Sequence, residues 1–150
     1  MTMKRPIALW FLLLWMIVLA IGGLYGGITM LIDPSGRLLQ MADVLHSLPV
    51  PNYILPGVFL LSVMGLVPLI LVYALLARPG WQWLEASLPR TKYYWAWIGI
   101  FVLVGILAIW LITEGVLIGF RWAIQYVTAI NGVLILLSAL LPSVRKFYRR

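Results

Sequence analysis

The sequence predicts an all-α polytopic membrane protein, in which four transmembrane helices form a bundle and a short outer interfacial helix lies between the first and second of them. Two observations lead to this prediction. Of 150 residues, 64% are apolar and only 10% are charged, which leaves too little polar surface for a water-soluble domain. Four apolar stretches also reach the roughly 20 residues that a helix needs to cross about 30 Å of hydrocarbon. We therefore expect a single domain, residues 1–150.

Each apolar stretch is expected to be helical, because backbone amides in lipid must find hydrogen-bond partners within their own segment. Lys4 and Arg5 precede the first stretch, as they would in a signal peptide. Its apolar run continues without the polar region that follows a cleavage site, so we expect a retained anchor. The predicted spans are Ile7–Leu31, Pro56–Ala77, Tyr94–Gly119 and Trp122–Leu141.

Basic residues are divided unequally between the two ends of these helices. Of the 11 Lys and Arg residues, nine fall on the side of the termini and of the loop between the second and third spans. Loops rich in Lys and Arg stay in the cytoplasm. We therefore predict a bacterial inner (cytoplasmic) membrane protein with cytoplasmic N- and C-termini. The nine are Lys4, Arg5, Arg78, Arg90, Lys92, Arg145, Lys146, Arg149 and Arg150, and the other two are Arg37 and Arg121.

Several chemistries lack the residues that they need. The chain has no cysteine, which excludes disulfides, iron–sulfur clusters and thiolate metal sites within it. His46 is its only histidine, so one chain cannot supply bis-histidine haem ligation. We expect no cofactor and no metal. We also expect no nucleic-acid partner, because the aromatic residues beside the basic loop are placed as an interfacial belt.

The connection between the first two spans, residues 33–55, has the sequence signals of an ordered segment. Asp33 offers a helix N-cap and Pro34 a first helical position. We expect a helix from there, lying either on the outer leaflet as an amphipathic connector or over an outward cavity as a lid. Arg37 and His46 are its candidate polar residues. Apolar residues recur at helical spacing at Leu38, Met41, Ala42 and Leu45.

Glycines at four-residue intervals indicate where helix backbones approach closely. Two overlapping G-x-x-x-G pairs lie in the first span, and a third lies at the end of the third span. The pairs suit either packing within the chain or dimerisation. Because three other helices are available in the chain, internal packing is favoured. The glycines are Gly22, Gly23, Gly26, Gly27, Gly115 and Gly119.

Glu114 is the leading candidate for a functional polar group, because an acid within a spanning helix carries an insertion penalty. Its distance from Tyr94, about 20 residues at about 1.5 Å each, places it near the outer interface. Arg121 follows seven residues later. We weigh a structural ion pair between Glu114 and Arg121 against a ligand-binding or proton-exchanging carboxylate in an outward vestibule.

Polar side chains also recur on one face of the fourth span, at Gln125, Thr128 and Asn131. Asn131 follows Trp122 by nine residues, which places it near the midplane. Such a residue commonly forms an interhelical hydrogen bond. The alternative is a polar track from Glu114 through Gln125 to Asn131.

Short motifs carry a resemblance to known proteins. With them, the chain resembles an uncharacterised family of bacterial four-helix inner-membrane proteins and is distantly similar in size and layout to DoxX-type proteins. The resemblance implies a four-helix bundle in the cytoplasmic membrane and no catalytic residue, and a DoxX-type protein would associate with redox partners. The motifs are Asp33-Pro34-Ser35-Gly36, Leu55-Pro56-Gly57, and Trp110 with Glu114 and Leu117-Ile118-Gly119.

Three functions are compatible with these features. The first is a non-enzymatic accessory or scaffold subunit of a membrane complex, with the lipid bilayer and another membrane protein or a second copy as partners. The compact size and the lack of a catalytic set favour it. The second is a small transporter or ligand-binding protein with an outward polar cavity around Glu114. Its other lining residues would be Arg121, Gln125 and Asn131.

The third function is a membrane enzyme acting on lipid or quinone. Such an enzyme needs an acid–base pair in a pocket. Asp33, His46 and Glu114 supply one only if the fold brings them together.

Overall fold

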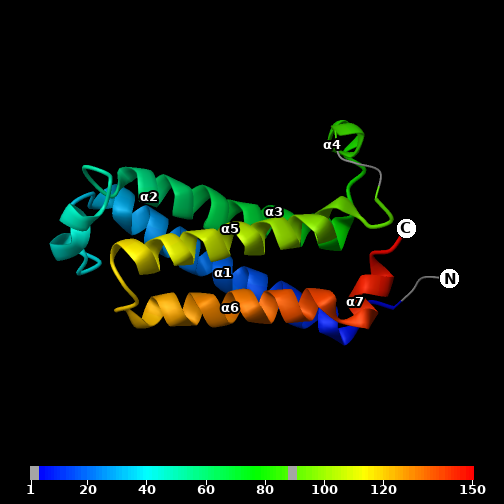
Figure 1. The fold of residues 1–150 in the computed structure, drawn as a ribbon. Coiled ribbons are helices and arrows are strands. Elements are labelled where there is room, and N and C mark those ends of the chain that lie inside the picture. The colour runs from blue at the N-terminus through cyan, green and yellow to red at the C-terminus, as the bar shows by residue number, and fades with distance from the viewer. Residues whose placement is uncertain (1–3, 88–90) are drawn as a thin grey trace.

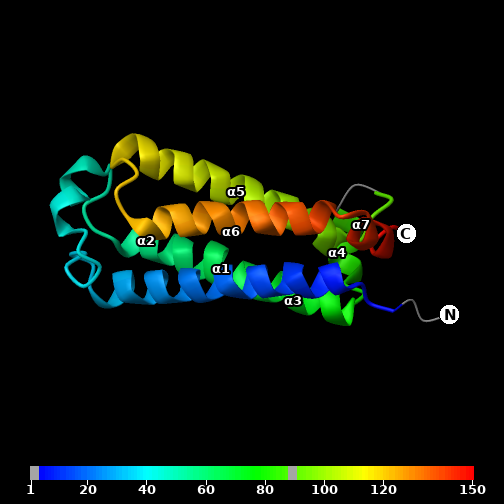
Figure 2. The ribbon, with the colours of Figure 1, turned by 90° about the horizontal axis from the view of Figure 1, so that it is seen from below.

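The computed structural model describes residues 4–87 and 91–150, and the prediction of an all-α bundle is confirmed for these residues. Four long helices run along one another (Figures 1 and 2) and are apolar and long enough to cross a membrane. Each of their ends lies within two residues of the predicted one. Arg90 lies outside the described residues. The spans are α1 (Ile7–Ile32), the composite second span (Ile54–Ala77), α5 (Trp95–Leu117) and α6 (Ala123–Leu140).

The second span consists of three helical segments. They are α2 (Ile54–Phe59), the π-helical η2 (Leu60–Leu66) and α3 (Val67–Ala77). Pro68, in the first turn of α3, has no amide hydrogen, and its ring would clash with the carbonyl of residue 64 in a regular α-helix. The wider, π-helical turns of η2 lie immediately before Pro68. They therefore fall where the proline prevents regular α-helical hydrogen bonding.

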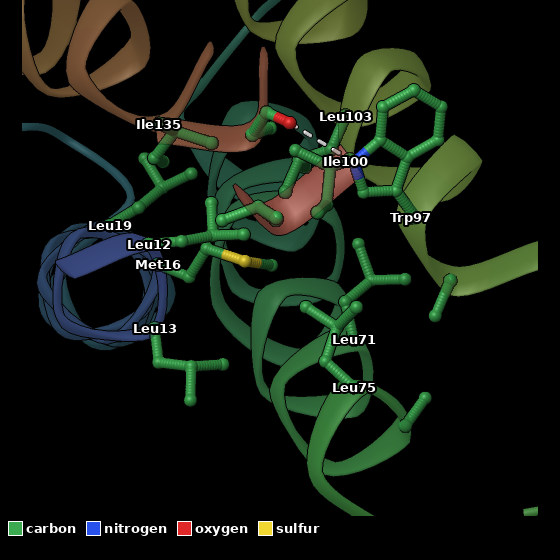
Figure 3. Packing of buried hydrophobic residues seen from close by; sticks show 14 of the residues in the cluster. Leu12, Leu13, Met16, Leu19, Leu71, Leu75, Trp97, Ile100, Leu103 and Ile135 are labelled. Carbon is green, nitrogen blue, oxygen red and sulfur yellow. Dashed lines mark hydrogen bonds between the residues drawn. The ribbon is translucent and has the colours of Figure 1, made fainter. Parts of the chain in front are cut away.

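The core lies along the bundle axis. Helix α1 packs against the second span and α6, while α5 packs against α3 and α6. Figure 3 shows Leu12 and Met16 of α1 facing Leu71 of α3, Ile100 of α5 and Ile135 of α6. The indole nitrogen of Trp97 donates to the carbonyl oxygen of Ala139 at 3.1 Å, and this bond joins α5 to α6 across the core.

Two glycines of α1 allow its backbone to touch that of the second span. A Cβ atom at Gly27 would lie 2.6 Å from the backbone nitrogen of Leu61 and 2.8 Å from the carbonyl oxygen of Gly57, and Gly23 faces the Met64 backbone in the same way. Gly22 faces open space. The close approach is therefore made within the chain by Gly23 and Gly27.

The glycines at the end of α5 form a turn and do not pack against another helix. Gly115 lies against the ring of Phe120, where a Cβ atom would collide with it. Gly119 has φ +77°, in the left-handed region that side chains disfavour. The chain therefore leaves α5 at this glycine and turns back to begin α6.

The outer connection contains the predicted short helix, but its predicted start near Pro34 is wrong. The helix is the 3-10 helix η1 (Ala42–Ser47). The Asp33 carboxylate accepts hydrogen bonds from the backbone amides of Ser35 and Leu38, at 3.2 and 2.8 Å, and so holds a turn. Gly36 and Gln40 have positive φ, which interrupts any helix that begins at Pro34.

The start of α1 and the C-terminus lie at the opposite end of the bundle, together with the short helices α4 (Gln82–Ser87) and α7 (Pro142–Phe147) (Figure 1). The hydroxyl of Tyr148 donates to the carbonyl oxygen of Leu75 at 2.8 Å and ties the end of α7 to α3. Burial of this phenol raises the pKa of Tyr148 to about 12.

Candidate functional site

A cavity of about 390 Å³, called the outer cavity because the sequence predicts that this end of the bundle faces outward, lies among the end of α1, the connection of residues 33–55, α2 and the last turns of α5. Its lining is almost entirely apolar. The sequence predicts a polar cavity around Glu114, and the structure places Glu114 in an apolar one. Among the described residues that line it are Val50, Tyr53, Phe59, Trp110, Glu114 and Leu117.

One face of α5 forms a wall of this cavity. Trp110, Thr113, Glu114 and Leu117 all line it, and they follow one another at intervals of three, one and three residues. This is the spacing of a single helix face. The same spacing in the sequence is the signal that could have identified Trp110 and Thr113 as neighbours of Glu114.

Aromatic rings form the inner part of the cavity. The rings of Phe59 and Trp110 are stacked with their centroids 4.5 Å apart, which joins α2 to α5. Tyr53 is buried at the other end, where its hydroxyl donates to the carbonyl oxygen of Met41 at 2.7 Å. Burial, and then the negative charges of Asp43 and Glu114, raise the pKa of Tyr53.

Glu114 is the only residue of formal charge among the described residues that line the cavity. The hydroxyl groups of Tyr53 and Thr113 already donate to backbone carbonyls, that of Thr113 to Ile109 at 2.8 Å. The surface of the cavity is therefore almost entirely apolar, even though Glu114 is among the residues that line it.

Glu114 and Arg121 do not form the predicted ion pair. Among residues 4–87 and 91–150, the ion pair that the structure forms joins Arg150 to Glu85 at the other end of the molecule. Arg121 lines a second cleft, of about 480 Å³, together with Asp43 and His46. Leu117 and Ile118 line both hollows, so these two apolar residues separate the acid from the base.

Gln125 is buried and has a structural role in the turn between α5 and α6. Its Oε1 accepts hydrogen bonds from the backbone amides of Arg121 and Trp122, at 2.9 and 3.2 Å. Its Nε2 donates to the carbonyl oxygen of Gly119 at 3.2 Å. The side-chain amide thus satisfies the backbone groups that the turn leaves without helical partners.

Asn131 is buried within the bundle, and its Oδ1 accepts no hydrogen bond from the described residues. The interhelical hydrogen bond that the sequence favours for Asn131 is therefore not made through this oxygen. Thr128, on the same helix face, is half-buried. Neither residue lines the outer cavity, so the predicted polar track from Glu114 does not extend to them.

The three residues of the predicted acid–base set lie apart in different surroundings. The Asp33 carboxylate holds the turn of the outer connection, and hydrogen bonds, that of the Ser35 side chain first, lower its pKa. His46 lines the second cleft and Glu114 lines the outer cavity. Arg37 is exposed on the connection. The geometry brings no two of Asp33, His46 and Glu114 into one pocket.

Comparison of the chain with protein-family models, with curated proteins and with solved structures found no match. The resemblance to DoxX-type proteins therefore stays a prediction.

Proposed function

We propose that this chain is a multi-pass inner-membrane protein with cytoplasmic termini, and that it binds a hydrophobic small molecule at its outer end. One observation carries the proposal: a cavity of about 390 Å³ with an almost entirely apolar lining that includes aromatic residues. Sites for small molecules commonly occupy about 300–1,000 Å³ and have mostly hydrophobic walls. The cavity has this size and these walls.

The proposed orientation rests on the charge distribution along the fold. Figure 1 shows the start of α1 and the C-terminus at the end of the bundle opposite the outer connection. Arg5 and Arg78 lie at that end, donating to the carbonyl oxygens of Leu76 and Phe147, and the Arg150–Glu85 pair lies there too. Under the positive-inside rule this end faces the cytoplasm. The cavity then opens at the outer side of the membrane.

The cavity favours ligand binding over the accessory-subunit hypothesis, because packing against another membrane protein would not require an apolar cavity inside the bundle. Native mass spectrometry of the protein in nanodiscs distinguishes the two. A single chain or homo-oligomer with a specific small molecule supports our proposal. A stable complex with a different polypeptide, and an empty cavity, supports the accessory subunit.

Photo-crosslinking tests the proposed site directly. The probe is a neutral alkyl diazirine, and the labelled peptides of the nanodisc-embedded protein are mapped by mass spectrometry. We expect saturable labelling of the α5 segment that contains Trp110 and Leu117. Val50→Trp adds an indole to the cavity wall from the outer connection, without changing a helix, and should reduce this labelling about tenfold.

Leu38→Trp is the matched control. Leu38 lies on the same connection, is 64% exposed and does not line the cavity. This variant should be labelled like the wild type. Labelling that does not saturate, or that Val50→Trp leaves unchanged, would show that the probe reaches α5 from the lipid and would refute the proposed cavity site.

A further inference from the structure

We propose that the occupant of the outer cavity is one hydrocarbon chain of a zwitterionic phospholipid, whose phosphate and ammonium groups lie in the second cleft beside Arg121 and Asp43. This inference rests on the proposed function and adds the chemical class of the ligand and a site for its headgroup. Three features of the described residues support it: the walls that the two hollows share, the charges in the second cleft and the order of the two hollows along α5.

The first feature is that the outer cavity and the second cleft lie between the same two parts of the fold. Residues 33–55 and the end of α5 contribute to both, and Leu117 and Ile118 line both. Along the connection, Met41 and Leu48 line the cavity, whereas residues between them line the cleft. An almost entirely apolar hollow thus adjoins a mostly polar one, which is the arrangement that an amphiphilic ligand needs.

The second feature is a pair of opposite charges in the second cleft. Arg121 and Asp43 both line it, and within residues 4–87 and 91–150 neither of them forms an ion pair. The guanidinium group of an arginine suits a phosphate group. The Asp43 carboxylate suits an ammonium group, and the last turn of α5 adds the partial negative charge of a helix C-terminus. A zwitterionic headgroup would pair with both side chains, whereas an anionic headgroup would pair with Arg121 alone.

The third feature is the order of the two hollows along α5. The cavity reaches inward to Trp110, which precedes Leu117 by about 10 Å along the helix axis. The cleft is lined by the last turn of α5 and by Arg121, which follows the helix. The hollow for the hydrocarbon chain therefore lies within the span, and the hollow for the headgroup lies at its end. A phospholipid in a membrane has the same order, with its chains in the hydrocarbon core and its charged groups at the interface.

Competition with the neutral alkyl diazirine tests the proposal, because labelling of the α5 segment requires an unoccupied cavity. The full chain is labelled in dodecyl maltoside micelles, and the mole fraction of added lipid that halves the labelling is measured. Three competitors share two oleoyl chains and differ in their headgroups: phosphatidylethanolamine is zwitterionic, phosphatidylglycerol is anionic and diacylglycerol has no charged group. Diacylglycerol therefore gives the contribution of the chains alone.

On the wild-type protein, we expect phosphatidylethanolamine to halve the labelling at a mole fraction about tenfold lower than diacylglycerol and about threefold lower than phosphatidylglycerol. The reason is that an exposed charge pair contributes about threefold, and the zwitterionic headgroup forms two such pairs. This comparison of three lipids does not depend on the folding of any variant.

Two variants test the two charges separately. Arg121→Gln removes the partner of the phosphate and should weaken competition by both phospholipids about threefold. Asp43→Asn removes the partner of the ammonium and should weaken only phosphatidylethanolamine, again about threefold. Diacylglycerol should compete equally in both variants and in the wild type.

Arg37→Gln is the matched control for Arg121→Gln. Arg37 is an exposed base on the same outer connection and is not among the described residues that line either hollow. This variant should behave like the wild type with all three lipids. A loss equal to that in Arg121→Gln would overturn the inference, because competition would then follow the overall outer charge.

Equal competition by the two phospholipids, or by all three lipids, would overturn the inference and leave the proposed cavity function standing. Saturable labelling that none of the lipids reduces would also overturn the inference alone, since the cavity would then bind a hydrophobic molecule of another class. Labelling that does not saturate would refute the inference and the proposed function together.

Discussion

Substitution of Gly27 by alanine should separate α1 from the second span. The added Cβ atom would lie 2.6 Å from the backbone nitrogen of Leu61, which is 0.8 Å short of the 3.4 Å at which ordinary contact begins. The atoms that it meets belong to the backbone, so no side-chain rotation relieves the overlap. The two helices must move apart, and overpacking of this kind costs about 1–3 kcal/mol.

Gly22→Ala is the matched control, because nothing lies within 4 Å of the Cβ position at Gly22. Both variants gain about the same helix propensity, up to about 1 kcal/mol, from replacement of glycine. The difference between their free energies of unfolding should therefore report packing alone. We expect Gly27→Ala to be less stable than Gly22→Ala by about 2 kcal/mol.

The assay is an SDS titration of the protein in dodecyl maltoside micelles, followed by tryptophan fluorescence. A difference below about 0.5 kcal/mol between the two variants would refute the backbone contact between α1 and the second span. A dimer interface at these glycines makes another prediction, namely that Gly27→Ala lowers energy transfer between labelled chains while the unfolding midpoint stays unchanged.

Two further predictions concern buried polar groups. Asn131→Leu keeps the number of side-chain heavy atoms and removes an oxygen that has no hydrogen-bond partner, so the same SDS titration should show an increase of about 1 kcal/mol in the free energy of unfolding. A loss of more than about 1 kcal/mol would mean that this amide has a partner that stabilises the bundle. Tyr148 should make stability pH-dependent, because its pKa is about 12 in the folded protein and the ordinary value of a tyrosine is about 10. Its contribution is complete below pH of about 10 and is lost as pH rises toward about 12, since the unfolded chain loses the proton first. Unfolding midpoints measured from pH 8 to 12 should fall less steeply in Tyr148→Phe, and equal slopes would contradict the assignment.

The four spans could be predicted from the sequence because their signal is local. Each is an apolar run of membrane-spanning length, and no tertiary contact is needed to recognise it. The start of the outer helix was not predictable in the same way. Asp33-Pro34 is a good N-terminal signal, but the positive φ of Gly36 and Gln40 and the turn held by the Asp33 carboxylate interrupt a helix there. Those features depend on how the connection folds back to bring its amides to Asp33.

The outer cavity was only partly accessible from the sequence. Glu114 could be selected because an acid within a membrane-spanning helix is rare, and the face shared with Trp110 and Leu117 follows from helix geometry. Tyr53 and Phe59 reach the cavity from a different segment, and only the packing of the second span against α5 brings them there. No local pattern reports such a contact.

The separation of Glu114 from Arg121 shows why spacing alone misled the prediction of an ion pair. Seven residues would place the two side chains on one face of a continuous helix, but α5 ends at Leu117. The left-handed Gly119 then turns the chain, and the hydrogen bonds of Gln125 hold the turn. As a result Arg121 lines the polar second cleft together with Asp43, while Glu114 lines the apolar outer cavity. The turn therefore places Arg121 and Glu114 in hollows of different polarity, which is why a spacing of seven residues does not give an ion pair here.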